Sequence, residues 1–496
     1  MPFYKKSVIL REEVIFMKGE PIVRIQRAVI KNFRNVEFGE IRFSCNFEKD
    51  VCAPEADILG IYGQNGSGKT TFIDALEILK TLLCGQKIDA ELSDCISYGQ
   101  EKAELQFEFS ILRLDEDNAL YRRRFVYSAV LSKDTIDETV KCVTFNSDSQ
   151  KNFRLKTIFE VIHQPESEIF APQVKLESLF GSKQNARRDE LRVTKLLCQK
   201  EHRSFLFSPE FIKILRDVAP EHDDGIEPIF EMSNFAQKSF FVILNRNNGL
   251  IALDAAIPVN FRMENVGGMF TLPIDRSATV PNRFLKIIRE VISTISTVLC
   301  KIVPGVNLTL VELGTELLED GSQGTKIQLA RELLCTDGEM HQLPLKYESE
   351  GIKKITSILH LLIAAYNNPS ITLAIDELDS GIFEYLLGEL LRVIQNSGKG
   401  QLIFTSHNLY PLETLKSRSI VFTTTNANDR YTRFKNVGNT SNLRSMYLRE
   451  VVLGGNDDVA LYEETSMSEI AHAMRIVNKR MEDIVLMETT PEVSDG

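Results

Sequence analysis

Apolar positions along the chain change their spacing several times, and each spacing predicts a different kind of element. A continuous apolar run at residues 58–62 predicts a short buried strand, and apolar residues at helical spacing over 72–83 predict a helix soon after it. Alternating positions within residues 99–130 predict an antiparallel hairpin. A second β-rich apolar run at residues 371–375 is followed by two carboxylates. The pattern is that of an α/β protein.

The second half of the chain alternates predicted helices and strands at short intervals. Apolar stripes at helical spacing occur in three segments, at residues 284–302, 352–366 and 383–395. Residues 306–313 and 326–334 are expected to form a hairpin that leads into the second of these helices. Residues 401–406 are expected to form a further strand, which ends just before a histidine.

Composition places the chain among ordinary globular proteins. A chain of 496 residues is long for a single core, so two or three packed units are expected. The hydrophobic content of 43% and the charged content of 26% are typical of globular proteins. No run approaches the ~18 apolar residues that cross a bilayer, and charges interrupt the apolar runs at the N-terminus, so we expect a cytoplasmic protein with no membrane contact. Eight scattered cysteines without a C-x-x-C pair predict neither disulfides nor a zinc site. A net charge of −11 argues against a surface that coats nucleic acid uniformly.

Residues 63–70 fit the phosphate-binding pattern G-x-x-x-x-G-K-[ST] without substitution, and they lie between a predicted strand and a predicted helix. Glycines let successive backbone N–H groups point at a phosphate, and the helix N-terminus adds a partial positive charge. We expect Lys69 to reach the β- and γ-phosphates and the Thr70 hydroxyl to ligand Mg²⁺. The residues expected to bind the nucleotide from this loop are Gly63, Asn65, Gly66, Gly68, Lys69, Thr70 and Thr71.

Two carboxylates follow the apolar run in the second half. Asp376 is expected to face Mg²⁺, and Glu377 to orient or deprotonate the attacking water. Because many strands end in acidic residues, the two carboxylates alone are weak evidence for a nucleotide site. They are supported by the next predicted strand, which is followed by His407 at the position expected for a γ-phosphate sensor. A histidine alone would more often be a cap or a core residue. We therefore expect Lys69, Glu377 and His407 to act in catalysis, with Thr70 and Asp376 holding the metal.

Ser349 precedes the helical stripe at 352–366 and is expected to cap that helix through its hydroxyl. The same hydroxyl and the N–H groups that follow it are free to bind an anion. Because Ser-x-Glu patterns cap helices widely, capping is the commoner use of this pattern taken alone.

Together these motifs resemble the head of ABC-type ATPases. The glycine loop, a degenerate signature loop at residues 349–351, the carboxylates, a D-loop at residues 378–380 and His407 follow the order and spacing of that family. Residues 29–35 resemble the opening strand of RecF- and SMC-like heads, in which the equivalent of Arg34 can lie near the phosphates. The Ser-Glu-Gly signature, with Glu-Leu-Asp after the apolar run, looks most like the OLD-like ATPases of bacterial anti-phage systems such as Septu, PARIS, Gabija and certain retrons.

The resemblance implies a fold and a mechanism. The fold is a P-loop NTPase with an ABC-type head, made of a mixed-sheet lobe plus an antiparallel β lobe, and an inserted, mainly helical domain. Two heads meet head-to-tail, so that Ser349 and Gly351 of one head cap the γ-phosphate held by Lys69 of the other, with Asp379 of the D-loop also at the nucleotide. ATP and Mg²⁺ are the implied ligands, and a homodimer or larger homo-oligomer is the implied assembly. Slow hydrolysis through Glu377 then works as a switch.

The chain is expected to divide into five segments. No sustained heptad pattern or C-x-x-C hook occurs, which disfavours long-armed SMC and zinc-hook proteins. Gln100 and Gln164 are both candidates for the glutamine of the Q-loop, and the sequence does not decide between them. The segments are an N-terminal extension at 1–20, a first ATPase lobe with the glycine loop and hairpin at 21–150, a mainly helical insertion at 151–290, a second ATPase lobe with the signature, carboxylates and His407 at 291–440, and a C-terminal unit at 441–496 with helices at 443–453 and 466–487 and an acidic tail.

Two functions compete at this stage. The resemblance favours the sensor or regulatory ATPase of an anti-phage defence system, which controls a separately encoded effector protein such as a nuclease or toxin. The segment after His407 is too short for the nuclease domain of OLD proteins, which favours a separate effector. The alternative is a RecF- or SMC-like DNA-repair ATPase that binds DNA directly. In that case Arg122, Arg123 and Arg124 in the predicted hairpin are the expected contact with the DNA backbone, although basic clusters are more often solvated faces.

Overall fold

The computed structural model describes residues 21–43, 56–114, 120–146, 154–164, 167–181, 186–218, 225–244, 256–263, 266–274, 276–318, 321–334, 339–434, 442–453, 460–462, 466, 468–474 and 476. The expected N-terminal extension and acidic tail lie outside these residues, as does much of the helix expected at 466–487. Within the described part of the chain, no helix is long and apolar enough to cross a membrane.

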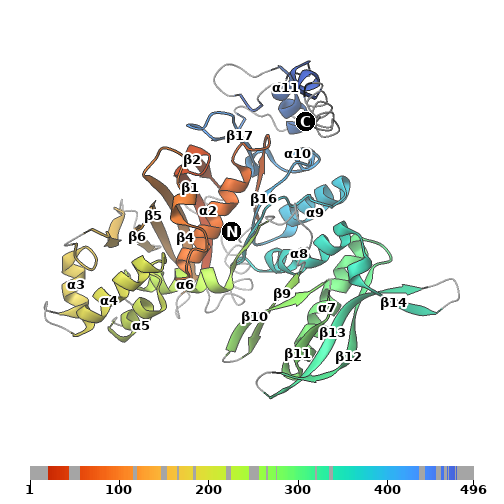
Figure 1. Cartoon of the computed structure of the whole chain (residues 1–496), viewed down its shortest axis with the longest axis horizontal. Helices are drawn as coiled ribbons and strands as arrows, with labels where there is room; N and C mark the ends of the chain where they lie inside the picture. The colour runs from red at the N-terminus through yellow and green to blue at the C-terminus, as the bar shows by residue number, and fades with distance from the viewer. Residues whose placement is uncertain are drawn as a thin grey trace, which may run out of the picture.

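A mixed sheet lies at the centre of the described residues, with strand order β18-β17-β3-β16-β15-β8 (Figure 1). Neighbouring strands are parallel except for the antiparallel pair of β17 and β18. All three strands expected at 58–62, 371–375 and 401–406 belong to this sheet. Its strands are β3 (Asp57–Tyr62), β8 (Phe240–Ile243), β15 (Thr372–Ile375), β16 (Gln401–Thr405), β17 (Ile420–Thr423) and β18 (Tyr431–Thr432).

Burial on both faces of the central sheet explains its continuous apolar runs. On β3, Leu59 packs into one core cluster and its neighbour Ile58 packs into another. The first cluster includes the apolar face of helix α2 (Lys69–Leu83), and the second includes that of helix α8 (Glu350–Asn367). Parallel strands that are covered on both sides need apolar side chains in both directions, which removes the alternation seen in half-exposed strands.

An antiparallel sheet shares the first core cluster with α2 and has strand order β2-β1-β4-β5-β6-β7. The hairpin expected within residues 99–130 is confirmed as the pair of β4 and β5, in which Phe107 lies opposite Tyr127. The strands of this sheet are β1 (Ile22–Phe33), β2 (Val36–Arg42), β4 (Lys102–Leu114), β5 (Leu120–Ser132), β6 (Ile136–Asn146) and β7 (Lys156–Val161).

The segment expected as a mainly helical insertion is more mixed than its pattern indicated. Strand β7 belongs to the antiparallel sheet, and β8 pairs with β15 in the central sheet. A separate hairpin joins β9 (Ala256–Met263) to β10 (Val266–Pro273). Strand β8 is too short for its periodicity to reveal it. The helices described in this segment are α3 (Gln173–Phe180), α4 (Ala186–Lys200), α5 (Pro209–Val218) and α6 (Glu227–Lys238).

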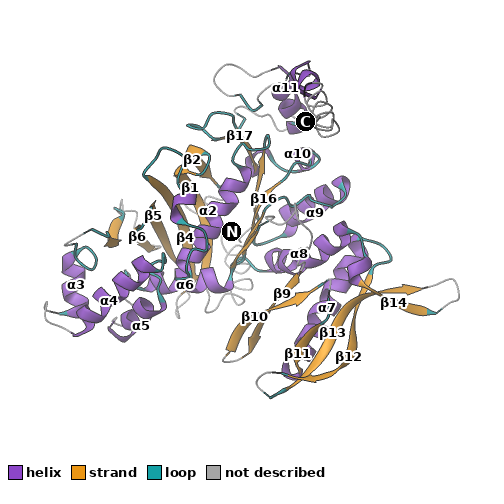
Figure 2. Ribbon diagram, viewed as in Figure 1, coloured by secondary structure: helices purple, strands orange, loops and turns teal. Residues whose placement is uncertain are grey.

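The second half adds another antiparallel sheet, with helix α7 beside it (Figure 2). The expected hairpin is confirmed as β12 and β13, in which Leu310 lies opposite Leu329. Central sheet, antiparallel sheet and covering helices together confirm the expected α/β class. The remaining elements are η2 (Leu92–Cys95), β11 (Ala278–Pro281), α7 (Asn282–Ile302), β12 (Asn307–Leu317), β13 (Gln323–Leu334), β14 (Met340–Pro344), η3 (Leu345–Tyr347), α9 (Glu384–Ser397), α10 (Pro411–Thr414), η4 (Ser417–Ser419) and α11 (Leu443–Leu453).

Candidate active site

The glycine loop joins β3 to α2 at the edge of the central sheet where its parallel strands end. Gly63, Gly66 and Gly68 adopt φ angles of 154°, 78° and 96°, a region that side chains disfavour. A β-carbon at Gly63 would lie 1.8 Å from Oγ1 of Thr423, so only glycine fits there. Gly68 is the N-cap of α2, so the free N–H groups of the first helical turn adjoin the loop. The backbone therefore has the geometry of an anion-binding loop.

Lys69 is the first residue of α2, and its side chain lies inside the glycine loop. Its Nζ donates hydrogen bonds to the carbonyl oxygens of Gly63 and Gln64, both at 2.9 Å. The residue is buried, and this burial lowers the pKa of Lys69, while the charges of nearby carboxylates, Asp376 and Glu377 among them, act in the opposite direction. An ammonium group held over the loop in this way is placed to contact a phosphate that the loop binds.

Thr405, the last residue of β16, joins the two halves of the site. Its Oγ1 donates a hydrogen bond to Oδ1 of Asp376 at 2.6 Å and accepts one from the backbone N–H of Glu377 at 2.7 Å. The Oγ1 of Thr70 also donates to Oδ1 of Asp376, at 3.3 Å, although the two residues are 306 positions apart in sequence. Strand β16 lies between β3 and β15, so its end bridges the glycine loop and the carboxylates. Thr405 belongs to none of the expected motifs, and its only signal in the sequence is its place two residues before His407.

Asp376 and Glu377 have different surroundings. Asp376 is 3% exposed, and burial raises its pKa, while the hydrogen bond from Thr405 opposes that rise and the charge of Glu377 adds to it. Glu377 is half-buried, and its φ of 46° lies in the left-handed region, which costs a residue with a side chain about 1 kcal/mol. Such strain persists where the surrounding structure holds it, and the hydrogen bond from the Glu377 N–H to Thr405 is part of that support.

Thr70 and Asp376 form a donor set that suits Mg²⁺. This ion prefers oxygen ligands, and proteins usually bind it through one or two side chains together with phosphate oxygens and water. A hydroxyl and a carboxylate oxygen 3.3 Å apart meet that requirement. Among the described residues, no group of three or more His, Cys, Asp and Glu side chains could hold a metal ion by itself. The residues present therefore fit Mg²⁺ that is bound together with a nucleotide.

The D-loop is tied to the segment that follows β16. Oδ2 of Asp379 accepts hydrogen bonds from the backbone N–H groups of His407 and Asn408, each at 2.9 Å. The side chain of His407 is exposed, and its strand ends at the same edge of the sheet as the strand that carries Asp376. The tertiary structure thus brings together the D-loop and the expected sensor histidine.

The expected signature loop lies at the N-terminus of α8. Ser349 is the N-cap, and its Oγ accepts a hydrogen bond from the N–H of Ile352 at 3.4 Å, as the capping interpretation predicts. Ser349 itself is exposed. A β-carbon at Gly351 would lie 2.1 Å from the carbonyl oxygen of Gly381, just beyond the D-loop. The start of α8 therefore packs backbone-to-backbone against the end of the D-loop.

Two residues that follow β1 contact the glycine loop and its helix. Arg34 forms an ion pair with Asp74 of α2, a residue whose side chain is almost fully buried. Asn35, which was not among the expected site residues, donates from Nδ2 to the Gly66 carbonyl at 2.6 Å and accepts from Thr71 Oγ1 at 2.6 Å. The structure therefore places Arg34 against the P-loop helix and Asn35 against the loop itself. The only sequence signal for Asn35 is its position beside Arg34 in the strand that resembles RecF-like heads.

The loop receives further support from residues of β17 and β18, which are far away in sequence. Oγ1 of Thr423 donates to the Tyr62 carbonyl at 3.2 Å and shares a hydrogen bond with the hydroxyl of Ser67. The hydroxyl of Tyr431 donates to the Gly68 carbonyl at 2.9 Å. Because Thr423 and Tyr431 belong to no recognisable motif, sequence reasoning had no signal by which to find them.

The basic cluster considered as a DNA contact is largely engaged within the protein. Arg123 is 5% exposed and forms ion pairs with Glu227 and Glu231 of α6. Arg124 pairs with Glu108 on the adjacent strand β4. The expectation that this cluster follows a DNA backbone is wrong for Arg123, because its side chain points inward onto the acidic residues of α6.

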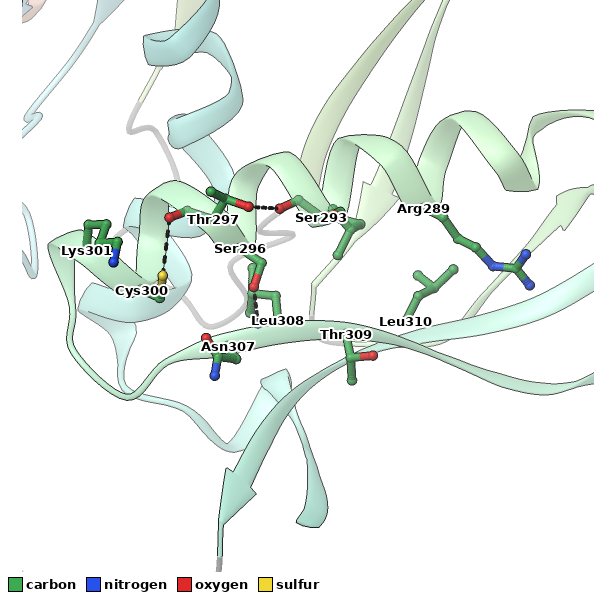
Figure 3. Close-up of a pocket in the computed structure, with 11 residues that line it drawn as sticks. Arg289, Ser293, Ser296, Thr297, Cys300, Lys301, Asn307, Leu308, Thr309 and Leu310 are labelled. Carbon is green, nitrogen blue, oxygen red and sulfur yellow. Dashed lines mark hydrogen bonds between the residues drawn. The ribbon is translucent and has the colours of Figure 1, made fainter.

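Gln100 and Gln164 are both exposed, and no hydrogen bond of the described residues joins either side chain to the glycine loop or to the carboxylates. A pocket of about 660 Å³ lies elsewhere, between α7 and the edge strand β12 (Figure 3). Ser296 on α7 accepts a hydrogen bond from the N–H of Leu308 there, at 2.8 Å. None of the motif residues lines this pocket, so it is separate from the candidate active site.

Similarity to individual known proteins is weak. No curated protein matches the chain in sequence. One weak structural likeness is to the SMC head domain from Thermotoga maritima, with 13% identity and a TM-score of 0.32 over 83% of this chain and 99% of that chain. A second is to the Smc head domain bound to the C-terminal domain of ScpA from Pyrococcus furiosus, with 14% identity and a TM-score of 0.36 over 87% of this chain and 100% of that chain. A third is to the ATP-bound recombination mediator protein RecF, with 12% identity and a TM-score of 0.32 over 78% of this chain and 92% of that chain. These scores are too low to support an inference about this chain. The "AAA ATPase domain" family, by contrast, matches residues 24–410, most of the chain, and the protein belongs to that family.

Proposed function

We propose that the protein binds ATP with Mg²⁺ and hydrolyses it slowly, as a conformational switch. The observation that carries the proposal is the hydrogen-bonded group in which Thr405 joins Asp376 and the Glu377 backbone, while Thr70 of the glycine loop reaches the same carboxylate. Membership of the AAA ATPase domain family supports the same reaction.

Each residue of the group has a distinct part in the proposed reaction. Lys69 binds the phosphates from inside the loop, and Thr70 with Asp376 holds Mg²⁺. Bound Mg²⁺ supplies positive charge against the phosphate oxygens as the γ-phosphoryl group is transferred to water. Glu377, which directly follows the metal ligand Asp376 in the sequence, orients the attacking water and accepts its proton. His407 lies at the end of the neighbouring strand, where it senses the terminal phosphate.

Phosphate release and nucleotide binding test the proposal together. Lys69→Ala should abolish nucleotide binding, because it removes the cation that the loop directs at the phosphates. Glu377→Gln should keep binding but lose turnover. Lys80→Ala, which changes a half-buried lysine in the last turn of α2, is a matched control and should keep both activities. Unchanged turnover in Glu377→Gln would refute the catalytic assignment.

We further propose that two copies associate head-to-tail around ATP. The supporting observation is that Ser349 and Glu350, at the N-terminus of α8, are exposed. A nucleotide held by one copy could then be capped by the α8 N-terminus of another. Mass measurement with and without a slowly hydrolysed ATP analogue should show ATP-dependent dimers that Ser349→Arg weakens. A monomer under both conditions would rule out this assembly.

We propose, on the OLD-like resemblance of the signature and D-loop, that the switch controls a separate effector in anti-phage defence. The burial of Arg123 weighs against the alternative, in which the hairpin binds DNA during repair. The test co-expresses the protein with the products of adjacent genes in bacteria and counts phage plaques. Protection that disappears with Lys69→Ala supports the proposal. Unaltered plating combined with sensitivity to DNA damage in Lys69→Ala cells would favour repair instead.

A further inference from the structure

The turn between β17 and β18 comprises residues 424–430 and lies beside the glycine loop. Backbone hydrogen bonds hold this turn against β2. The N–H of Phe38 donates to the Ala427 carbonyl at 2.9 Å, and the N–H of Arg430 donates to the Phe38 carbonyl at 3.1 Å. Because these bonds involve no side chains, the turn should keep its place when one of its side chains is changed. The side chain that reaches the glycine loop from this turn is that of Arg430.

Arg430 lies across the start of α2. A β-carbon at Gly68, the N-cap of this helix, would lie 3.2 Å from Cγ and 3.3 Å from Cδ of Arg430. The arginine is 7% exposed, so its guanidinium group is largely withdrawn from water. Its Nη1 donates to the Thr424 carbonyl and its Nη2 to the Asn35 carbonyl, each at 2.8 Å. The side chain therefore joins the turn, the residue after β1 and the start of the P-loop helix.

The positive charge of Arg430 is incompletely compensated. Both of these hydrogen-bond acceptors are neutral carbonyl oxygens, and Nε is buried without a hydrogen-bond partner in the described part of the chain. The carboxylate whose charge acts on Arg430 is that of Glu37, which is exposed to solvent. Burying a cation with so little opposite charge is costly, and an anion bound nearby offsets the cost. The glycine loop beside Arg430 is a site for such an anion.

Asn35 connects Arg430 to the glycine loop. Its backbone carbonyl accepts the hydrogen bond from Arg430, while its side chain contacts the loop in two places. Nδ2 donates to the Gly66 carbonyl and Oδ1 accepts from the Thr71 hydroxyl, both at 2.6 Å. Gly66 and Thr71 lie on either side of Lys69 in the sequence, so the Asn35 side chain spans the phosphate-binding turn. Fixing the Asn35 backbone reduces the freedom of the loop before a nucleotide binds, and such preorganisation increases affinity.

We infer that Arg430 is a positioning residue for ATP binding: it fixes Asn35 against the glycine loop, and its charge favours the triphosphate that the loop receives. The inference rests on the proposed ATP binding and adds to it a residue that no motif marks. Arg430 does not touch the nucleotide in this scheme. Its hydrogen bonds lead to Asn35 and Thr424, not to the carboxylates after β15, so it should affect the binding of ATP and leave the hydrolysis step unchanged.

The test uses the full-length protein and compares Arg430→Met with the matched control Arg433→Met. Arg433 follows β18, and its guanidinium group also donates to backbone carbonyl oxygens, those of Arg418, Ile420 and Arg42. None of these carbonyls belongs to the glycine loop. Both substitutions should lower the melting temperature, whereas only Arg430→Met should weaken the binding of ATP.

Affinity for a fluorescent ATP analogue, kcat at saturating ATP and the melting temperature are measured for each variant. We expect Arg430→Met to raise Kd by about tenfold or more, because the charge-assisted hydrogen bond to Asn35 and a positive charge near the phosphates are both lost. Its kcat should stay within about twofold of the wild type, as for the loss of an interaction that contributes to binding alone. Arg430→Lys keeps the charge without the forked contact, so its Kd should lie between those of Arg430→Met and the wild type. Arg433→Met should bind the analogue within about twofold of the wild type.

The double variant of Arg430→Met with Asn35→Ala tests the connection through Asn35. If Arg430 acts through the Asn35 side chain, the double variant should lose less affinity than the product of the two single losses, because both changes release the same contact. Losses that multiply would overturn the inference. Normal affinity in Arg430→Met, an equal loss in Arg433→Met, or a kcat that falls as much as affinity would overturn it as well.

If Arg430→Met does not fold, Arg430→Lys and Arg430→Gln replace it, and equal affinities in these two overturn the inference because only the first keeps the charge. A wild-type protein that binds ATP, with no effect at Arg430, refutes the inference alone. A wild type that does not bind ATP refutes the proposed function and the inference with it.

Discussion

Replacing Thr405 with valine tests whether the end of β16 organises the active site. The substitution keeps the shape of a buried side chain and removes one hydroxyl. That hydroxyl makes two contacts, as donor to Asp376 at 2.6 Å and as acceptor from the Glu377 N–H at 2.7 Å. The change therefore withdraws a hydrogen bond from the expected metal ligand and from the backbone of the expected catalytic residue at once.

The size of the effect follows from those two contacts. A hydrogen bond to a charged group contributes about 1.5–3 kcal/mol, and a backbone N–H left without a partner costs about 1–3 kcal/mol. Thr70 still donates to Asp376, so we take the lower part of the sum and expect the free energy of unfolding to fall by about 2.5–4 kcal/mol. If about half of this loss is expressed in the transition state, kcat falls by about 10- to 30-fold.

Phosphate release at saturating ATP and urea unfolding measure the two consequences separately. The matched control is Thr372→Val at the other end of β15, where an equally buried hydroxyl donates to Gln401 at 3.3 Å. The control should lose stability without a comparable loss of kcat, and Thr405→Ser should keep most of the activity. If Thr405→Val and Thr372→Val lose stability equally and both keep wild-type kcat, Thr405 does not organise the site and our reasoning is refuted.

Three further predictions concern other parts of the molecule. Gly351→Ala should keep nucleotide binding but lower turnover by about tenfold or more, measured by phosphate release, because its β-carbon meets Gly381 O at 2.1 Å. Arg123→Met should lower the free energy of unfolding by about 3 kcal/mol in urea titrations, since it removes the closer ion-pair partner of the buried carboxylate of Glu231 and leaves only Arg113 at 3.6 Å, and retained stability would contradict this. Burial lowers the pKa of Lys195 to about 8, so between about pH 8 and 10.5 the unfolded chain binds more protons than the folded one. Thermal melting should therefore show the wild type gaining stability relative to Lys195→Met as the pH rises through this range.

The sequence by itself determined the parts of the site that are local in the chain. The glycine pattern at 63–70 predicts an anion-binding loop, because positive φ angles and a helix start are properties of a few consecutive residues. The strands at 58–62 and 371–375 were also predictable, since burial on both faces demands unbroken apolar runs. Ser349 was recognisable as a cap for the same local reason.

The tertiary structure alone decided which of these parts meet and what holds them. It placed Thr405 between Asp376 and the Glu377 backbone and brought Asn35 onto the glycine loop. It also turned Arg123 from an expected DNA contact into a buried partner of α6. Such contacts join segments that lie far apart in sequence, and the partner of a buried polar group is fixed by how strands and helices pack. Spacing along a single chain carries no record of that packing, whereas the cost of an unpaired buried polar group makes it decisive in the fold.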